Sequence, residues 1–266
     1  MNSAMSRMDL LREKHGFVCD MDGVIYHGNQ LLPGVKEFVD WLKATDKRFL
    51  FLTNASGRSP KELKRKLARM GLDVGEDNFY TSAQATAKFL SNQAPGCSAY
   101  VIGEPGLYNA IYDAGITMND VDPDYVIVGE TYNYNLDYIC KAMRMVEKGA
   151  KLIGTNSDLI YPDEVGNVPA CRAIVAPIEL TTGRQAYYIG KPNPLMMRTA
   201  LHMLDTHSGD AVMIGDRMDT DIIAGIESGM TSVLVLSGVS TVENIKVYPY
   251  QPHYILNGVG DIPTKA

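Results

Sequence analysis

The chain has 266 residues, enough to bury a large apolar core as one large domain or as a core with a second lobe. Its 45% hydrophobic and 21% charged residues are the composition of an ordinary globular protein, and no apolar stretch approaches the roughly 18 residues of a membrane span. The net charge of −6, without a long run of Lys or Arg, argues against a surface for nucleic-acid polymers or anionic membranes.

The N-terminal segment and the cysteines bear on the compartment. Residues 1–14 contain Arg and Lys but no apolar stretch of signal-peptide length, so we expect a loosely ordered leader. The cysteines are far apart and form no C-x-x-C pair, which favours reduced thiols over a disulfide framework or a zinc site. Together these features predict a cytoplasmic protein.

The first predicted strand ends in acidic residues. An apolar segment at 17–19 runs into Asp20 and Asp22, and Gly23 follows, which lets the backbone turn tightly and approach a ligand. Ligands of parallel α/β sheets bind beyond the carboxyl ends of the strands, so this pattern predicts a strand that carries functional carboxylates. An acidic turn after a strand is the alternative when the motif is taken alone.

Two helices and a second strand follow. Apolar residues at i, i+3, i+4 and i+7 predict a helix over 35–42 that packs one face on a sheet. The apolar segment 48–52 predicts a strand that stops at the hydrogen-bonding residues Thr53 and Asn54. Ser59, Pro60 and Glu62 have the spacing of an N-cap, a first helical position and a capping box, so a helix is expected to begin there.

A second series of strand and helix units is predicted between about 83 and 184. The apolar segments 100–102 and 125–128 each end in Gly-Glu, and 152–154 predicts a third strand. Apolar spacing over 136–143 predicts a helix, and the Pro- and Gly-containing segment 161–169 is expected to be a loop. This part of the chain therefore predicts a small α/β lobe of its own.

After this lobe, the chain returns to strands that end in polar residues. A short strand at 187–189 leads to Lys191, and the nearly all-apolar strand 211–214 ends at Asp216. Asp219 and Asp221 begin a helix, and another strand follows at 232–236. Alternating strands and helices predict an α/β fold with a Rossmann-like, doubly wound parallel sheet.

Four strand ends of this predicted sheet carry polar side chains. Taken singly, Thr53 and Asn54 can be a turn, Lys191 a solvated cation before a proline, and Asp219 and Asp221 helix caps. A chance occurrence of all these polar groups at one edge of the sheet is much less expected than a chance occurrence of any one of them. The set therefore favours a functional site.

These motifs resemble, in order, the four motifs of the haloacid dehalogenase superfamily. The matching segments are the D-x-D-G at 20–23, Thr53–Asn54, Gly190–Lys191–Pro192 and the segment 215–221. The insertion resembles a C2-type cap, which places the chain in subclass IIA beside NagD-type nucleotide phosphatases and p-nitrophenyl phosphatases. The resemblance implies a HAD-like catalytic core at 1–82 and 185–266 and an inserted α/β C2-type cap domain at 83–184, which would close over the site and choose the substrate.

The resemblance also implies roles that agree with the chemistry of the side chains. Asp20 would be the nucleophile that forms an aspartyl phosphate, and Asp22 the general acid and then the general base. Catalysis would further use Thr53 and Lys191. The expected substrate-binding groups are Asp22, Gly23, Thr53, Asn54 and Lys191.

A count of charges predicts the cofactor. Asp20, Asp216 and a phosphate dianion would carry four negative charges, or five with Asp221, against one positive charge on Lys191. Like charges about 4 Å apart repel by about 4 kcal/mol at an effective dielectric of about 20. Oxygen ligands without His or Cys select a hard cation, Mg²⁺. The implied metal residues are Asp20, Asp22 through its backbone carbonyl, Asp216 and Asp221, although Asp221 has helix capping as an alternative.

The predicted function is Mg²⁺-dependent hydrolysis of small phosphomonoesters, with nucleoside 5′-monophosphates such as UMP favoured. Sugar phosphates, phosphoglycolate and pyridoxal phosphate are alternatives within the same subclass. A non-catalytic phospho-accepting or binding module, comparable to a receiver domain, is the alternative of a different class, and a phosphoryl-transferring mutase is a third. The expected partner is the small-molecule substrate, and a homodimer stays open because cap surfaces mediate dimers in relatives.

Overall fold

The computed structural model describes residues 6–162 and 166–263. The chain divides into two compact units. The first, the core unit, holds the described residues up to Leu52, Lys64–Phe79 and those from Met197 onward. The second, the inserted unit, holds Thr53–Leu63 and Tyr80–Met196. The predicted functional boundaries, a cap at 83–184 and a core on either side of it, stay a prediction.

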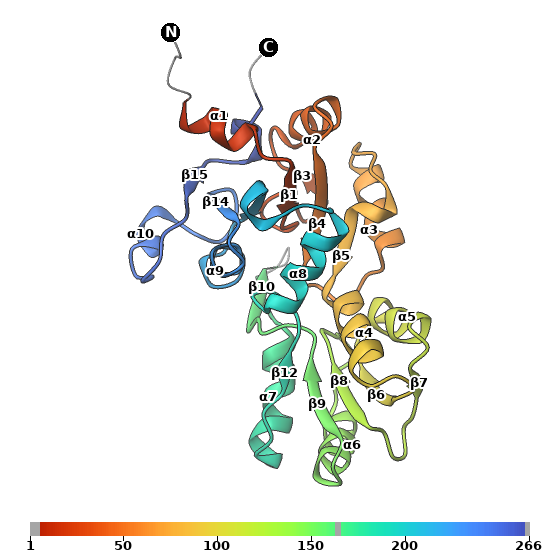
Figure 1. Ribbon diagram of the computed structural model, residues 1–266. Helices are drawn as coiled ribbons and strands as arrows, with labels where there is room; N and C mark the ends of the chain where they lie inside the picture. The colour runs from red at the N-terminus through yellow and green to blue at the C-terminus, as the bar shows by residue number, and fades with distance from the viewer. Residues whose placement is uncertain (1–5, 163–165, 264–266) are drawn as a thin grey trace. The chain divides into compact units, whose positions relative to one another are not determined.

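The core sheet has six strands in the order β15-β14-β13-β1-β4-β5 (Figure 1). β1 pairs in parallel with β13 on one side and β4 on the other, and Cys19 lies opposite both Ile214 and Phe51. Every residue of β1 and β13 is buried, as expected of central parallel strands. The bounds are β1 (Gly16–Cys19), β4 (Arg48–Thr53), β5 (Phe79–Thr81), β13 (Ala211–Gly215), β14 (Thr231–Val235) and β15 (Tyr254–Leu256).

Helices, one hairpin and short turns connect or follow the strands of this sheet. The apolar face predicted for α2 is buried at all four positions. Ser59 and Glu62 exchange the capping hydrogen bonds predicted for the start of α3. The elements are α2 (Val35–Ala44), α3 (Pro60–Arg69), α8 (Pro194–Met203), α9 (Ile223–Glu227), α10 (Val242–Ile245), the hairpin β2 (Tyr26–His27) and β3 (Gln30–Leu31), and the turns η1 (Glu76–Asn78), η2 (Ser208–Asp210), η3 (Met218–Ile222) and η4 (Val259–Asp261).

The predicted loosely ordered leader is wrong for residues 7–12. They form helix α1 (Arg7–Arg12), which Ser6 and Asp9 begin with a capping box. Leu11 is fully buried, and the Tyr254 hydroxyl donates to the Arg7 carbonyl over 2.7 Å, so α1 is fixed beside β15 (Figure 1). The buried leucine, the cap and long-range hydrogen bonds hold the short helix, although its charged residues resemble a solvated tail. Residues 1–5 lie outside the described residues.

The inserted unit has a five-stranded sheet of its own, in the order β12-β9-β8-β6-β7, with parallel pairing. Apolar residues of α6 and α7 pack on alternate residues of β6, β8 and β9 and form one continuous core. The bounds are α4 (Ser82–Gln93), β6 (Ser98–Ile102), α5 (Pro105–Asp113), β7 (Thr117–Met118), β8 (Tyr125–Val128), α6 (Leu136–Glu147), β9 (Lys151–Gly154), α7 (Cys171–Thr182) and β12 (Tyr187–Tyr188). The predicted α/β fold, with a parallel-sheet core and an inserted α/β lobe, is confirmed.

The predicted loop at 161–169 contains regular structure. β10 (Ile160–Pro162) pairs antiparallel with β11 (Asn167–Pro169). The intervening residues 163–165 lie outside the described residues. Pro162 and Pro169 suggested a loop, but a proline is tolerated in a two-stranded ribbon because each strand has an edge that needs no N–H donor.

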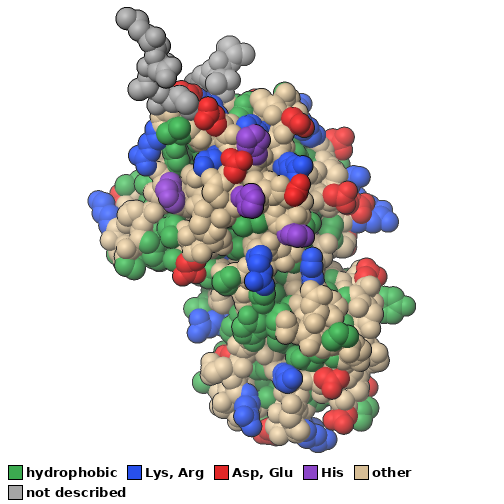
Figure 2. Space-filling model, in the orientation of Figure 1, with side chains coloured by type: hydrophobic (Ala, Val, Ile, Leu, Met, Phe, Trp, Pro, Cys, Tyr) green, Lys and Arg blue, Asp and Glu red, His purple; other side chains and the backbone are tan. Residues whose placement is uncertain are grey.

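The distribution of surface charge and the character of the helices both agree with the composition. Lys and Arg side chains are interspersed with Asp and Glu side chains on the face that Figure 2 shows. Within the described residues, none of the helices combines the length and the apolar character that crossing a membrane requires.

Candidate active site

Three aspartates meet at the carboxyl ends of neighbouring strands of the core sheet. Asp20 follows β1, Asp216 follows β13, and Asp221 lies in the turn η3. Each offers a carboxylate oxygen, and these oxygens all lie within 4.8 Å of one another. Asp20 is 9% exposed, Asp216 2% and Asp221 0%, so the cluster gathers negative charge where little water screens it.

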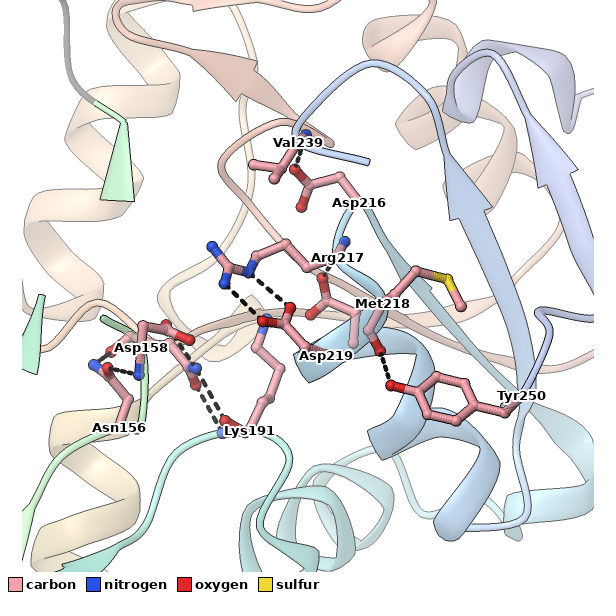
Figure 3. Close-up of polar contacts among 11 residues, drawn as sticks. Asn156, Asp158, Lys191, Asp216, Arg217, Met218, Asp219, Val239 and Tyr250 are labelled. Atoms are coloured by element: carbon pink, nitrogen blue, oxygen red, sulfur yellow. Dashed lines mark hydrogen bonds and ion pairs between the residues drawn. The ribbon is translucent and has the colours of Figure 1, made fainter. Parts of the chain in front are cut away.

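Backbone N–H groups orient two of these carboxylates, and Figure 3 shows the contact of Asp216 with Val239. The Val239 N–H donates to Asp216 Oδ2 over 2.7 Å, and the Arg217 N–H donates to Asp221 Oδ2 over 3.1 Å. The Arg217 guanidinium pairs with Asp219 at the surface through two hydrogen bonds, of 3.2 and 3.1 Å. Asp219 is therefore bonded to Arg217, and the cluster is formed by the other three aspartates.

Two glycines leave room for the Asp216 carboxylate. Gly23 has φ +78°, a conformation that favours glycine, and a Cβ at this position would lie 2.5 Å from Asp216 Oδ2. A Cβ at Gly238 would also collide with the Asp216 side chain. The sequence predicted that Gly23 lets the backbone turn tightly. In the structure, Gly23 also leaves the space that the Asp216 carboxylate occupies.

The donor set fits a hard divalent cation. Three carboxylates supply oxygen ligands only, one oxygen of each lies within 4.8 Å of the others, and two of them are oriented by N–H donors. The adjacent thiol adds no charge, because burial, and secondarily the Asp20 carboxylate, raise the pKa of Cys19 far above its usual range. The cluster can therefore hold a metal through oxygen.

Asp22 lies two residues after Asp20, at the start of a compact turn, and its side chain is exposed. The Tyr26 hydroxyl donates to Asp22 Oδ2 over 3.1 Å. A carboxylate exposed beside a buried carboxylate cluster has the access that proton exchange with a substrate or with water requires.

The remaining predicted residues belong to the inserted unit, where Asn54 and Lys191 are bonded directly. Asn54 Oδ1 accepts from the Lys191 N–H over 2.7 Å, and Asn54 Nδ2 donates to the Lys191 carbonyl over 3.1 Å and to Asp158 Oδ2 over 3.0 Å. Thr53 is the last residue of β4, and its hydroxyl accepts from the Ala55 N–H. The Asn54 side chain thus holds the Lys191 backbone by two hydrogen bonds, a contact that we call the Asn54 clamp. A common site for these residues and the aspartates stays a prediction.

A half-buried acid supports this clamp. Glu130, after β8, accepts hydrogen bonds from the Ser56 N–H over 3.1 Å, from the Ser56 hydroxyl and from Asn156 Nδ2. Asn156 Nδ2 also donates to the Asn54 carbonyl over 2.8 Å. Glu130 is therefore linked to Asn54 through Asn156, at the carboxyl ends of strands β8 and β9.

Sequence reasoning missed three supporting residues. Tyr26 follows the apolar residues Val24 and Ile25, so its place in the sequence gives no sign of a polar role. Val239 acts through its backbone N–H, which no residue type reveals. Glu130 did carry a signal, the repeated Gly-Glu at strand ends, but its hydrogen-bond partners Ser56 and Asn156 are distant in sequence.

A parallel α/β sheet that gathers carboxylates at the ends of its central strands is the architecture of an α/β enzyme whose ligand binds at this edge. Comparison with known proteins identifies the family. A model described as haloacid dehalogenase-like hydrolase matches residues 17–117, and one described as HAD-hydrolase-like matches 188–262. The chain belongs to the haloacid dehalogenase-like hydrolases, as a phosphatase of the NagD subclass.

Similar proteins cover almost the whole chain. The ribonucleotide monophosphatase NagD of Escherichia coli K12 is 43% identical over 245 residues, which are 92% of this chain and 96% of the relative. The dihydroxyacetone phosphatase of Corynebacterium glutamicum is 42% identical over 246 residues, 92% of this chain and 90% of the relative. The solved structure of NagD from Escherichia coli K-12 has a TM-score of 0.88 at 42% identity and covers 94% of this chain and 98% of its own. The 4-nitrophenylphosphatase of Thermotoga maritima has a TM-score of 0.91 at 33% identity, with 95% and 97% covered.

Proposed function

We propose that the protein is a Mg²⁺-dependent phosphatase that hydrolyses small phosphomonoesters through an aspartyl-phosphate intermediate. The observation that carries the proposal is the convergence of Asp20, Asp216 and Asp221 within 4.8 Å, with the exposed Asp22 two residues from Asp20. Membership of the phosphatase family supports the reaction type.

Two steps account for the hydrolysis. An Asp20 oxygen attacks phosphorus, the bond from phosphorus to the ester oxygen breaks, and its electron pair stays on that oxygen, which takes a proton from the Asp22 carboxyl. Water then attacks the phosphorus of the aspartyl phosphate and gives a proton to the Asp22 carboxylate. The bond from phosphorus to Asp20 breaks, which restores both aspartates and releases inorganic phosphate.

Asp20, the Asp22 backbone carbonyl, Asp216 and Asp221 would hold the Mg²⁺ ion. When bound, the cation supplies the positive charge that lets a phosphate dianion approach a nucleophile of like charge. Asp216 and Asp221 each accept a hydrogen bond from a backbone N–H, and this supports a preorganised site.

Substrate phosphate would be bound by Gly23, Thr53, Asn54 and Lys191 besides Asp22. Lys191 is 2% exposed, and a buried ammonium near a phosphoryl group offsets charge strongly. The Asn54 side chain is occupied by Lys191 and Asp158, so we assign its phosphate contact to the backbone N–H and its side chain to holding Lys191.

The clamp on Lys191 can be tested by Asn54→Asp. The variant keeps an acceptor for the Lys191 N–H but replaces two donated hydrogen bonds by an oxygen that faces the Lys191 carbonyl and the Asp158 carboxylate. We expect a loss of about 2–4 kcal/mol of unfolding free energy and a rise in KM for p-nitrophenyl phosphate. Thermal unfolding and steady-state kinetics measure both.

Asn119→Asp is the matched control, because the Asn119 amide also bridges backbone groups of the inserted unit. It should leave KM unchanged. An Asn54→Asp enzyme with the wild-type KM would refute a role for the clamp in substrate binding.

Among substrates, we propose nucleoside 5′-monophosphates first, because the relative at 43% identity is named a ribonucleotide monophosphatase. The relative at 42% identity is named a dihydroxyacetone phosphatase, and those at 35–36% acid sugar phosphatases, so small sugar phosphates are the second candidate. Phosphoglycolate and pyridoxal phosphate stay as further candidates. We propose that residues 83–184 act as the cap that chooses among them and that the enzyme works in the cytoplasm, which its four free cysteines support.

The experiment is phosphate release from a panel of phosphomonoesters, with Mg²⁺ and with EDTA. The panel contains p-nitrophenyl phosphate, the nucleoside 5′-monophosphates, dihydroxyacetone phosphate and several sugar phosphates. We expect Mg²⁺-dependent turnover of p-nitrophenyl phosphate and a clear preference for one substrate class. A wild-type protein without activity on the whole panel would overturn the proposed function.

A further inference from the structure

The turn that carries Asp22 folds back onto itself. The Tyr26 carbonyl accepts from the Gly23 N–H over 2.9 Å, and the Met21 carbonyl accepts from the Ile25 and Tyr26 N–H groups over 2.8 and 3.2 Å. The reversal returns Tyr26 to the level of Asp22, where the two residues form an isolated parallel bridge. Its local hydrogen bonds therefore fix the position of Tyr26 relative to Asp22.

The Tyr26 ring is buried, whereas the Asp22 side chain is exposed. Tyr26 is 3% exposed, and its hydroxyl donates to Asp22 Oδ2 over 3.1 Å. A buried tyrosine hydroxyl is usually hydrogen-bonded, and here its partner is the carboxylate that we propose as the general acid and base. An exposed aspartate samples several rotamers, so a donor on a fixed ring selects one of them.

Lys66, from helix α3, secures the ring from another part of the chain. Its Nζ lies 3.6 Å from the centroid of the Tyr26 ring, well within the range of a cation–π contact. Lys66 and Tyr26 belong to the same compact unit. The ammonium also withdraws electron density from the ring, which makes the phenol a stronger hydrogen-bond donor.

From these contacts we infer that Tyr26, braced by Lys66, is the positioning residue that holds the Asp22 carboxyl in the orientation for proton transfer to the leaving group. The inference rests on the proposed function and adds to it a residue outside the four motifs. Tyr26 acts through Asp22 and takes no proton itself.

The leaving group provides a specific test. p-Nitrophenolate is a stable anion that departs without a proton, whereas the alkoxide from an alkyl phosphate needs one. The ratio kcat/KM reports events up to the first irreversible step, here departure of the leaving group, so it excludes the later hydrolysis of the aspartyl phosphate. A residue that positions the general acid must therefore matter more for the alkyl phosphate.

The experiment compares wild type, Tyr26→Phe and Lys66→Met on p-nitrophenyl phosphate and on the best alkyl phosphate of the panel. Tyr26→Phe keeps the buried ring and removes only the hydroxyl. We expect its kcat/KM to fall about 10- to 100-fold on the alkyl phosphate, the effect of losing a hydrogen bond to a charged group, and less than about 3-fold on p-nitrophenyl phosphate. Lys66→Met should show a smaller loss with the same selectivity, and Lys66→Arg, which keeps a cation over the ring, should restore the wild-type ratio.

Tyr254→Phe is the matched control, because it removes a hydroxyl hydrogen bond to a backbone carbonyl of the same unit. It should leave both substrates unaffected. Equal losses of Tyr26→Phe on the two substrates, or no loss, would overturn the inference while the proposed function stands. A wild type inactive on both substrates would overturn both.

Discussion

Replacing Asp20 by asparagine is expected to lower kcat by about 10⁴-fold or more, the scale seen when a nucleophile is removed from an enzyme. The amide that replaces the carboxylate is neutral and a poor nucleophile, and no other aspartate of the cluster can take over. The carboxylates of Asp216 and Asp221 are instead held by the backbone N–H groups of Val239 and Arg217. Phosphate release from p-nitrophenyl phosphate in the presence of Mg²⁺ measures the loss.

Stability should change in the opposite direction to activity. In metal-free buffer Asp20→Asn removes one of three like charges whose oxygens lie within 4.8 Å, so we expect the variant to be more stable than wild type by about 2 kcal/mol. Asp219→Asn is the matched control, because Asp219 lies in the same turn but pairs with Arg217 at the surface. It should keep wild-type activity. Substantial turnover by Asp20→Asn would show that Asp20 is not the nucleophile.

Removal of divalent metal is expected to abolish turnover, and Mg²⁺ should restore it. Without a cation, three clustered carboxylates would face an incoming phosphate dianion, and the repulsion amounts to about 4 kcal/mol per pair of charges at about 4 Å. Mg²⁺ at about 100 times its Kd should stabilise the folded protein by about 2.7 kcal/mol, which corresponds to a rise of about 5–10 °C in Tm. Phosphate release and thermal unfolding, each with EDTA and with Mg²⁺, check the two effects.

Asp216→Asn separates binding of the ion from nonspecific salt effects. It should lose the Mg²⁺-dependent rise in Tm, whereas Asp219→Asn should keep it. Full activity in EDTA, together with a Tm that does not respond to Mg²⁺, would rule out the proposed metal site.

Local sequence patterns predicted much of the fold. The buried face of α2 follows from the spacing of four apolar residues, and the start of α3 follows from Ser59 and Glu62, because helix periodicity and capping depend on near neighbours in the chain. The apolar segments at 17–19 and 211–214 predicted buried parallel strands, which are β1 and β13. Asp20 and Asp216 directly follow these two strands, and pairing of β1 with β13 brings them together.

The features that the sequence did not reveal depend on contacts between distant residues. α1 is held by Tyr254, almost 250 residues away, so its own residues resemble a tail. Tyr26 reads as part of an apolar segment, and only the reversal at 21–26 turns its hydroxyl onto Asp22. The role of the Asn54 side chain was also hidden, because its partners Asp158 and Lys191 come more than 100 residues later.

The placement of β1 at the centre of its sheet constrains the order of folding during synthesis. β1 leaves the ribosome early, but one of its two neighbours, β13, begins only at Ala211, and β14 and β15 follow later still. The sheet of the inserted unit is complete once Tyr188 has been made. Non-local pairs form slowly because a long loop must close first. The inserted unit can therefore fold on the nascent chain while β1 still lacks its partner β13. During that interval the unpaired apolar edge of β1 is open to non-native contacts.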